Sequence, residues 1–427
     1  MPRSPSPDCV RGAAALVVVL GLGTVGPLPL CAQELDSVRV AMSGEVRVRS
    51  ELDARTSGTG TDHATLLRTR LAALAQVGDE VSAYIQISDS RALGEETSTL
   101  TDAAADRLDL HQAFLSWTPR ETVELRIGRQ ELAFADERLM GAVNWANVTR
   151  AFDGARLTLR RGPWTIDGFA TVLDERAALL ATGLSPRANQ DSASDRTLVG
   201  LWASTDDVDL FVLADRNAVD GPTRTDIDRF TLGARGRGRF GRLSVRGTAA
   251  VQLGRQDQAG APRQDIEAYL LTAAAEYGFD GPSRGRIGAQ IDILSGDEDP
   301  LDDSFGSFNT LYATNHAFYG YMDLFLDLPR QTEGLGLVDL IVRGAVQPRE
   351  WTLRADLHRF LLARESAAGD HGIGYELDLT ASRALARGLG LRVGYSLFSP
   401  SAAGEVPPVG LGPDTLHWAY VQLLARF

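Results

Sequence analysis

Arginine side chains have the clearest capacity for binding chemistry in this 427-residue sequence. The sequence contains no lysine, so every fixed positive charge is a planar guanidinium whose donors match the two oxygens of a carboxylate or phosphate. Acidic residues nevertheless outnumber basic ones by 56 to 43, and the formal net charge is −13. Because net charge does not show where the charges lie, the positions of the arginines along the chain decide what they can bind.

Many arginines occupy alternate positions in segments whose other positions are apolar or small. Phe230 and Leu232, for example, precede a run in which Arg235, Arg237 and Arg239 are each separated by one glycine. A period of two predicts β-strands with one apolar and one polar face. These segments reach roughly ten residues, the length that a tilted strand needs to cross a bilayer, whereas soluble strands typically have about five or six. The apolar face would then contact lipid, and the arginine-rich face would line a water-filled lumen. The same alternation occurs in 38–49, 69–88 and 243–253.

The connections between these segments alternate between short and long. Outer-membrane barrels have this asymmetry, with short periplasmic turns and longer external loops. The pattern predicts about thirteen strands up to the one that holds Ile287 and Ile293, and about five after residue 335. Since neighbouring strands run in opposite directions, we expect 295–335 to be one long external excursion. The fold class is therefore all-β, an antiparallel transmembrane β-barrel of about 18 strands. The short links are 78–80, 119–121, 162–163, 205–207 and 240–241, and the long ones are 50–63, 91–107 and 175–195.

Residues 1–32 have the pattern of a secretory signal peptide, which leaves 33–427 as the barrel. Arg3 and Arg11 charge the start, a short apolar core follows, and Ala32 ends a cleavage site. Both cysteines lie in this leader, so the mature chain is expected to have no disulfide and no cysteine-based zinc site. A glycine pattern at 21–26 resembles a dinucleotide-binding turn, but prolines follow at once where a helix would have to begin.

The last segment also alternates, with Val421, Leu423 and Ala425 on the same face as the final Phe427. A terminal aromatic residue on such a strand is typical of the signal that the outer-membrane assembly machinery reads. We therefore expect that machinery and outer-membrane lipid to be partners of the chain.

Two stretches have a more specific pattern. The first reads Gly128-Arg129-Gln130-Glu131-Leu132, Asp136-Glu137-Arg138-Leu139, Asn144-Trp145-Ala146-Asn147 and Arg150-Ala151-Phe152-Asp153-Gly154-Ala155-Arg156. The second reads Ser295-Gly296-Asp297-Glu298-Asp299-Pro300, then Phe308-Asn309-Thr310-Leu311-Tyr312, Asn315-His316 and Gly320. Together they resemble the alginate export family of outer-membrane porins. The resemblance implies an 18-stranded barrel in the bacterial outer membrane, with an arginine-rich, selective conduit for an anionic polysaccharide. It does not imply that alginate itself is the cargo.

The candidate site follows from strand phase and from this resemblance. The alternation of side chains along each strand places Arg126, Arg156 and Arg160 on the lumen face. Arg129 falls on the opposite face in this alternation and is expected at a strand end or bulge. A polyuronate carries one carboxylate per sugar, which an arginine can bind through two hydrogen bonds and still release in water. The predicted pore-lining and substrate-binding residues are Arg47, Arg68, Arg70, Arg126, Arg129, Arg138, Arg150, Arg156, Arg160, Arg235, Arg237 and Arg246. The carboxylates expected to tune them by pairing are Glu131, Asp136, Glu137 and Asp153.

Other interpretations compete with these assignments. The 128–156 stretch could be mainly structural, packing a loop against the barrel wall. Asp297, Asp299 and Asp302 offer oxygen ligands for calcium, but their spacing is not that of a known calcium loop, so a solvated acidic loop is favoured and no metal or cofactor is expected. The glycine–arginine run at 233–239 is better explained by a lumen-facing strand than by nucleic-acid binding.

Three functions remain open at this level. The first is a conduit for an anionic polysaccharide or for small anionic solutes. The second is a general or anionic-solute diffusion porin, which would differ only in its loops and lumen charge. The third is an outer-membrane enzyme or adhesin. No pattern links a nucleophile to any histidine, so we predict that the protein is not an enzyme.

Overall fold

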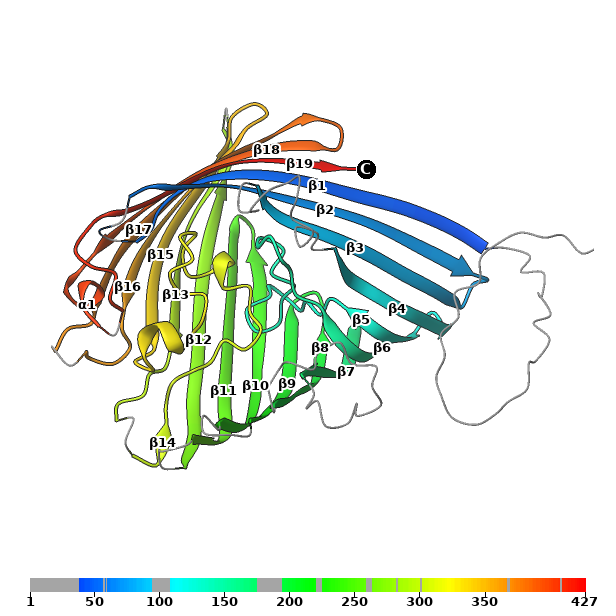
Figure 1. Ribbon diagram of the computed structural model, residues 1–427, viewed down its shortest axis with the longest axis horizontal. Helices are drawn as coiled ribbons and strands as arrows, with labels where there is room; N and C mark the ends of the chain where they lie inside the picture. Colours follow the sequence, from blue (N-terminus) through cyan, green and yellow to red (C-terminus); the bar gives the residue numbers. More distant parts are fainter. Residues whose placement is uncertain are drawn as a thin grey trace, which may run out of the picture. The chain divides into compact units, whose positions relative to one another are not determined.

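The computed structural model describes residues 38–56, 58, 60–93, 108–174, 194–219, 225–258, 263–281, 283–299, 302–366, 369–407 and 409–427. The leader predicted at 1–32 and much of the long segments at 91–107 and 175–195 lie outside the described residues. Within them, β-strands form a single sheet that closes on itself (Figure 1).

Eighteen of the nineteen strands in the sheet make up the wall of the barrel. Each pairs antiparallel with the next, and β19 pairs with β1 to close the ring. The first thirteen are β1 (Val38–Ala54), β2 (Asp62–Val77), β3 (Val81–Leu93), β4 (Asp109–Arg120), β5 (Val123–Gln130), β6 (Phe152–Arg161), β7 (Trp164–Asp174), β8 (Ser194–Ser204), β9 (Val208–Val219), β10 (Thr225–Phe240), β11 (Leu243–Gln258), β12 (Gln264–Phe279) and β13 (Arg284–Leu294). The last five are β15 (Leu337–Gln347), β16 (Thr352–Leu361), β17 (Gly372–Ala386), β18 (Leu389–Pro400) and β19 (Leu416–Arg426).

The remaining elements are short. β14 (Ser304–Phe305) pairs in parallel with β12, two 3₁₀ turns cover Asn315–Ala317 and Arg330–Thr332, and α1 spans Ala402–Glu405. No helix in the described part of the chain is long and apolar enough to cross a membrane.

The strands alternate between a lumen face and a lipid face, as predicted. On β1, Arg47 and Arg49 are 3% and 4% exposed, whereas Val48 between them is 37% exposed and faces outward. On β10 the outward Phe230 and Phe240 are ten positions apart, which at about 3.4 Å per residue and a tilt of about 40° spans about 26 Å. Just beyond Phe230, the exposed ion pair between Arg216 and Asp228 marks the end of this apolar band. The wall therefore has the height and aromatic borders of a membrane-spanning barrel in the bacterial outer membrane.

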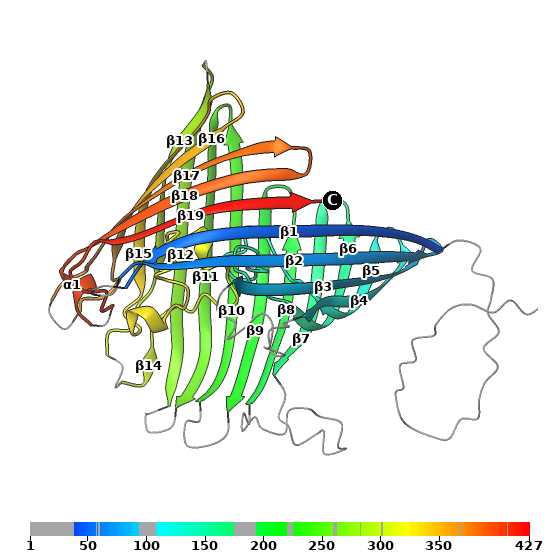
Figure 2. The same ribbon diagram turned by 45° about the horizontal axis from the view of Figure 1, so that its top comes forward.

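The predicted strand count and the single excursion between β13 and β15 are confirmed, but much of the excursion does not project outward. From residue 306 it contacts lumen-facing residues of the wall: Gln252 on β11 accepts from the Asn309 N–H, and Glu376 on β17 accepts from the Met322 N–H. The 131–151 segment also lies within the ring of strands, and both views agree on this placement (Figures 1 and 2).

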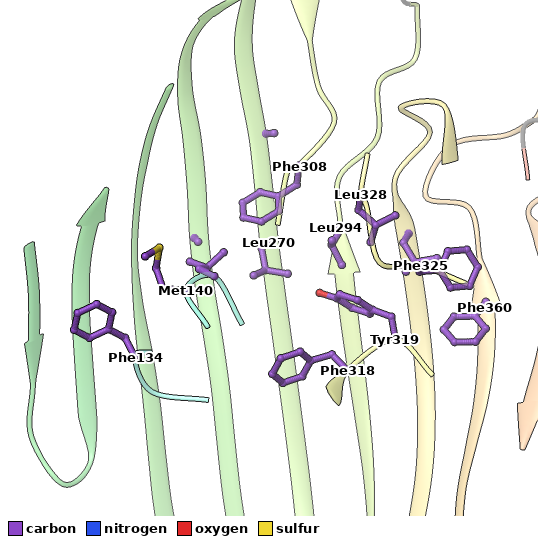
Figure 3. Packing of buried hydrophobic residues seen from close by; sticks show 14 of the residues in the cluster. Phe134, Met140, Leu270, Leu294, Phe308, Phe318, Tyr319, Phe325, Leu328 and Phe360 are labelled. Carbon is purple, nitrogen blue, oxygen red and sulfur yellow. The ribbon is translucent and has the colours of Figure 1, made fainter. Parts of the chain in front are cut away.

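A buried apolar cluster fixes these two segments inside the barrel. Phe318, Tyr319 and Phe325 of the second segment lie against lumen-facing residues of the wall such as Leu294 and Phe360 (Figure 3). The Phe325 and Phe360 ring centroids are 4.8 Å apart. Burying one such side chain contributes about 1.5–3 kcal/mol. The main apolar core thus lies in the lumen, where the inserted segments and the wall exclude water together.

Candidate functional site

The two inserted segments are joined to each other, and we call them together the plug (131–151 and 306–335). Met140 and Tyr312 form a parallel bridge between them. The Tyr312 carbonyl accepts from the Gly141 N–H at 2.8 Å, and the Leu139 carbonyl accepts from the Tyr312 N–H at 2.9 Å. The Thr314 hydroxyl also donates to Glu137. These contacts connect the two segments of the plug directly.

Arginines of β1 and β2 hold the first segment through its carbonyl oxygens. Arg47 donates to the carbonyls of Asn144, Trp145 and Ala146 at 2.9–3.1 Å. Arg68 donates to the first and last of these and also pairs with Glu45 at 2.6 Å. The remaining donors on this side are Arg49, which bonds the Trp145 carbonyl and Glu51, and Arg70, which bonds the Asn144 side chain and Thr149.

Carboxylates on the other side of the wall hold the plug through its donors. Asp292 on β13 forms an ion pair of 2.8 Å with Arg138, and the Arg138 guanidinium lies 4.0 Å from the Phe318 ring centroid. Burial alone would lower the pKa of Arg138, but the Asp292 charge raises it above its ordinary value. Glu376 and Asp378 on β17 accept from backbone N–H groups of the plug at 2.9 and 3.2 Å. The plug is therefore held by positive charge at β1–β2 and by negative charge at β13–β17.

Six of the twelve predicted arginines thus form hydrogen bonds or ion pairs with the plug or from within it. Arg150 donates to the Tyr312 carbonyl, and Arg235 lies 3.3 Å from Asp136 of the plug and 3.2 Å from Asp209 of β9. The six are Arg47, Arg68, Arg70, Arg138, Arg150 and Arg235.

The four predicted pairing carboxylates take different partners. Glu131 lies 2.8 Å from His111 and 4.0 Å from Arg70, so its arginine contact is the longer one. Asp136 contacts Arg235, as already described, and Asp153 contacts Arg129. Glu137 differs, because it accepts from Thr314 and from the Ala142 N–H and has no arginine ion pair among the described residues.

Arg129 lies at the end of β5, on the strand face opposite to the one that faces the lumen. It binds Asp153 through two hydrogen bonds of 2.7 and 2.8 Å. The preceding Gly128 has φ +129°, and an added Cβ would lie 2.2 Å from the Ala113 carbonyl oxygen. Only glycine fits there, so this part of the 128–156 motif sets the exit of the chain from β5 into the plug.

The other arginines form a partly open group near the periplasmic turns, which we call the arginine belt. Two of their partners are shared within the group: Glu124 contacts both Arg126 and Arg160, and Glu276 contacts both Arg246 and Arg286. Exposed fractions of the ion-paired belt side chains range from 20% at Arg156 to 59% at Arg286. The belt comprises Arg126, Arg156, Arg160, Arg237, Arg246, Arg286, Arg343 and Arg354, with the carboxylates Glu124, Asp167, Asp209, Glu276 and Asp356.

Sequence reasoning missed Arg286, Arg343 and Arg354 of the belt. A detectable signal exists for the last, because Arg354 and Asp356 are two positions apart and so share a face. Glu124 and Arg126 have the same spacing and also bond each other. On β5 and β16 an acid and an arginine separated by one residue therefore form a lumen-facing pair, whereas Asp89 and Arg91 of β3 have the same spacing on the opposite face.

No group of three metal ligands occurs among the described residues, including the acidic stretch considered for calcium. Asp297 is buried, and burial raises its pKa above the usual range of an aspartate. Asp302 accepts from the Ser304 N–H at 2.8 Å and so caps its own turn. The described part of the stretch begins the excursion after β13.

Comparison with known proteins agrees with this architecture. The alginate export family matches residues 38–405. Among solved structures, OpdK of Pseudomonas aeruginosa, determined with vanillate, is 11% identical with a TM-score of 0.59 and covers 92% of this chain and 99% of its own. OccAB4 of Acinetobacter baumannii is 9% identical with a TM-score of 0.59, covering 92% and 100%. OccK8 (OprE) of P. aeruginosa is 12% identical with a TM-score of 0.56, covering 91% and 98%.

No curated protein matches the chain. The structural likenesses show the barrel fold, and the family match spans nearly all of the barrel. The protein belongs to the alginate export family and is an outer-membrane pore.

Proposed function

We propose that the pore conducts an anionic polysaccharide, alginate-like in carrying regularly spaced carboxylates. The observation that carries this proposal is the arginine belt, in which seven of the eight arginines form ion pairs with five carboxylates on the lumen face near the periplasmic turns. The belt is net positive although the whole chain is acidic. A polyanion entering from the periplasm therefore meets arginines whose positive charge is not fully neutralised by the carboxylates of the belt.

The shared carboxylates suit transport better than tight retention. Arg126 and Arg160 both contact Glu124, so each keeps guanidinium N–H donors that can bind a passing carboxylate. The same Glu124 competes with the cargo for those donors. Passage requires sites that bind strongly enough to admit an ion and weakly enough to release it.

Planar-bilayer recording tests this function. Under a salt gradient, the reversal potential of the full-length protein should indicate preference for anions. Trigalacturonate, which has one carboxylate per sugar, should reduce the current, whereas uncharged maltotriose of the same length should not. Cation preference together with absence of block would contradict the proposal.

A small-anion porin is the second candidate. The likeness to OpdK, whose structure was determined with the small carboxylate vanillate, favours this alternative. Block by vanillate at concentrations where trigalacturonate has no effect would select it. Turnover in a screen of phospholipid and peptide substrates would instead support the enzyme alternative.

The final residue supports the proposed interaction with the outer-membrane assembly machinery. Phe427 points outward and is 72% exposed, and its backbone pairs with Gly44 of β1 through bonds of 2.8 and 3.1 Å. If the assembly machinery binds this exposed ring, it would hold β19 beside β1, the strand with which β19 pairs. Phe427→Ala should slow assembly into heat-modifiable barrels, while the substitution of another exposed aromatic residue, Phe240→Ala, should not.

A further inference from the structure

Three buried arginines at the β1–β2 hairpin carry more positive charge than their neighbours balance. Arg47 and Arg68 lie directly opposite each other in the strand register, and Arg70 follows on the same lumen face. Their exposed fractions are 3%, 3% and 7%. Glu45 pairs with Arg68 and Glu131 lies 4.0 Å from Arg70, but no carboxylate forms an ion pair with Arg47 in the described part of the barrel. Like charges placed opposite each other and withdrawn from water destabilise a sheet unless something compensates them.

The remaining compensation comes from uncharged oxygens. The 144–147 turn presents the three carbonyls described above and the Asn147 side-chain oxygen to Arg47. The Nε atoms of Arg47, Arg68 and Arg70 remain buried without any hydrogen-bond partner. A guanidinium bonds a carboxylate roughly twice as strongly as a neutral acceptor. The turn therefore fills the arginine cluster with a weaker ligand than the cluster can bind.

We propose that Arg47, Arg68 and Arg70 form a carboxylate-binding site and that the 144–147 turn is a latch that occupies this site in the resting pore. This inference rests on the proposed function, because the competing ligand is a carboxylate of the anionic cargo. When a cargo carboxylate binds the three guanidinium groups, it displaces the carbonyl oxygens and releases the turn. The conduit is then opened by the solute that it conducts.

Release of the latch also separates an aromatic stack. Trp145 lies 4.3 Å from the His316 ring and parallel to it, and the Arg49 guanidinium is 4.1 Å from the Trp145 ring centroid. The Trp145 and Tyr420 ring centroids are 5.0 Å apart in a T-shaped arrangement, and Tyr420 belongs to β19. Movement of the turn therefore reaches the second half of the plug through His316, so that the latch and the plug are mechanically connected.

Thiol labelling of the full-length protein tests the latch. Ala146→Cys places a thiol within the turn, and Val148→Cys is the matched control because Val148 is already 71% exposed. Trigalacturonate should accelerate modification of the thiol at position 146 by about tenfold, the effect of about 1.4 kcal/mol. Maltotriose should not accelerate it, and the rate at position 148 should not change with either sugar. An unchanged or slower rate at position 146 with trigalacturonate would overturn the proposal.

A second variant identifies the arginine site. In the Arg47→Gln background, modification at position 146 should already be fast without ligand, and trigalacturonate should have no further effect. A full response to the ligand in this background would also overturn the proposal. If Arg47→Gln does not give a heat-modifiable barrel, Arg47→Lys replaces it, since it keeps the charge but loses the fork.

The reversal potential separates this inference from the function on which it rests. Anion preference without accelerated labelling refutes the latch alone. Absence of anion preference in the full-length protein refutes the proposed function as well.

Discussion

Arg138 of the plug and Asp292 of β13 form an ion pair of 2.8 Å, with 4% of the Arg138 side chain and none of the Asp292 side chain exposed. Removing one partner leaves an uncompensated buried charge, which costs about 3–5 kcal/mol. Arg138→Met should therefore loosen the plug and make 131–151 sensitive to protease in the folded barrel. Combining Arg138→Met with Asp292→Leu should restore much of the resistance, because both charges are then gone. Equal sensitivity of the single and double variants would show that charge is not what holds this end of the plug.

Gly128 should tolerate no side chain. Its φ of +129° and the approach to the Ala113 carbonyl predict that Gly128→Ala lowers stability by about 1–3 kcal/mol. Gly390 is the matched control, because nothing lies within 4 Å of its added Cβ. The difference in stability between the two variants is measured by the temperature at which heating changes the gel mobility of each barrel. Similar temperatures for the two variants would contradict the close packing of β5 against β4.

The arginine belt should set ion selectivity. Arg237 and Arg246 lie directly opposite each other on β10 and β11, so replacing both with glutamine removes two positive charges at one level of the lumen. The reversal potential should move toward that of a non-selective pore. Arg216→Gln removes an arginine that lies beyond the lipid band and should have no effect. A similar shift in both variants would place the selectivity elsewhere.

Asp297 should make the start of the excursion after β13 sensitive to pH. Burial raises the pKa of Asp297 above its unfolded value, so the folded segment binds the proton more tightly than the unfolded one. The stabilisation is complete below the unfolded pKa and is lost as pH rises through the folded pKa. Asp297→Asn should therefore protect the segment from protease at neutral pH and flatten its pH dependence. Asp327→Asn changes an exposed carboxylate of the same excursion and should leave both properties unchanged.

The sequence determines the wall much more directly than the lumen. Period-two alternation depends only on neighbouring residues, so the opposite faces of Arg47 and Val48 could be predicted without any contact information. Strand direction is similarly a matter of counting, which is why the single excursion between β13 and β15 could be inferred before its path was known.

The interior required information that local patterns do not contain. Arg47 bonds carbonyls roughly one hundred residues away, and those oxygens belong to the backbone, which has the same chemistry at every position. The motif around Trp145 indicated a specific segment but not its inward course. Glu376 and Asp378 resemble any polar lumen position in the sequence, although the plug donates to both. Candidate lining residues were therefore predictable, whereas the division between anchors and belt was not.

The pairing of β1 with β19 has a consequence for how the barrel forms. Its partners, such as Glu45 and Arg426, are 381 residues apart, whereas each other neighbouring pair in the wall joins strands consecutive in the chain, with only β14 between β13 and β15. Hairpins can accumulate by local steps, but the seam closes only in one long-range event with a large loss of chain entropy. Until that event, two rows of unpaired N–H and C=O groups would face hydrocarbon, where each unsatisfied group costs several kcal/mol. We therefore expect insertion into the membrane to be coupled to closure of the β1–β19 seam.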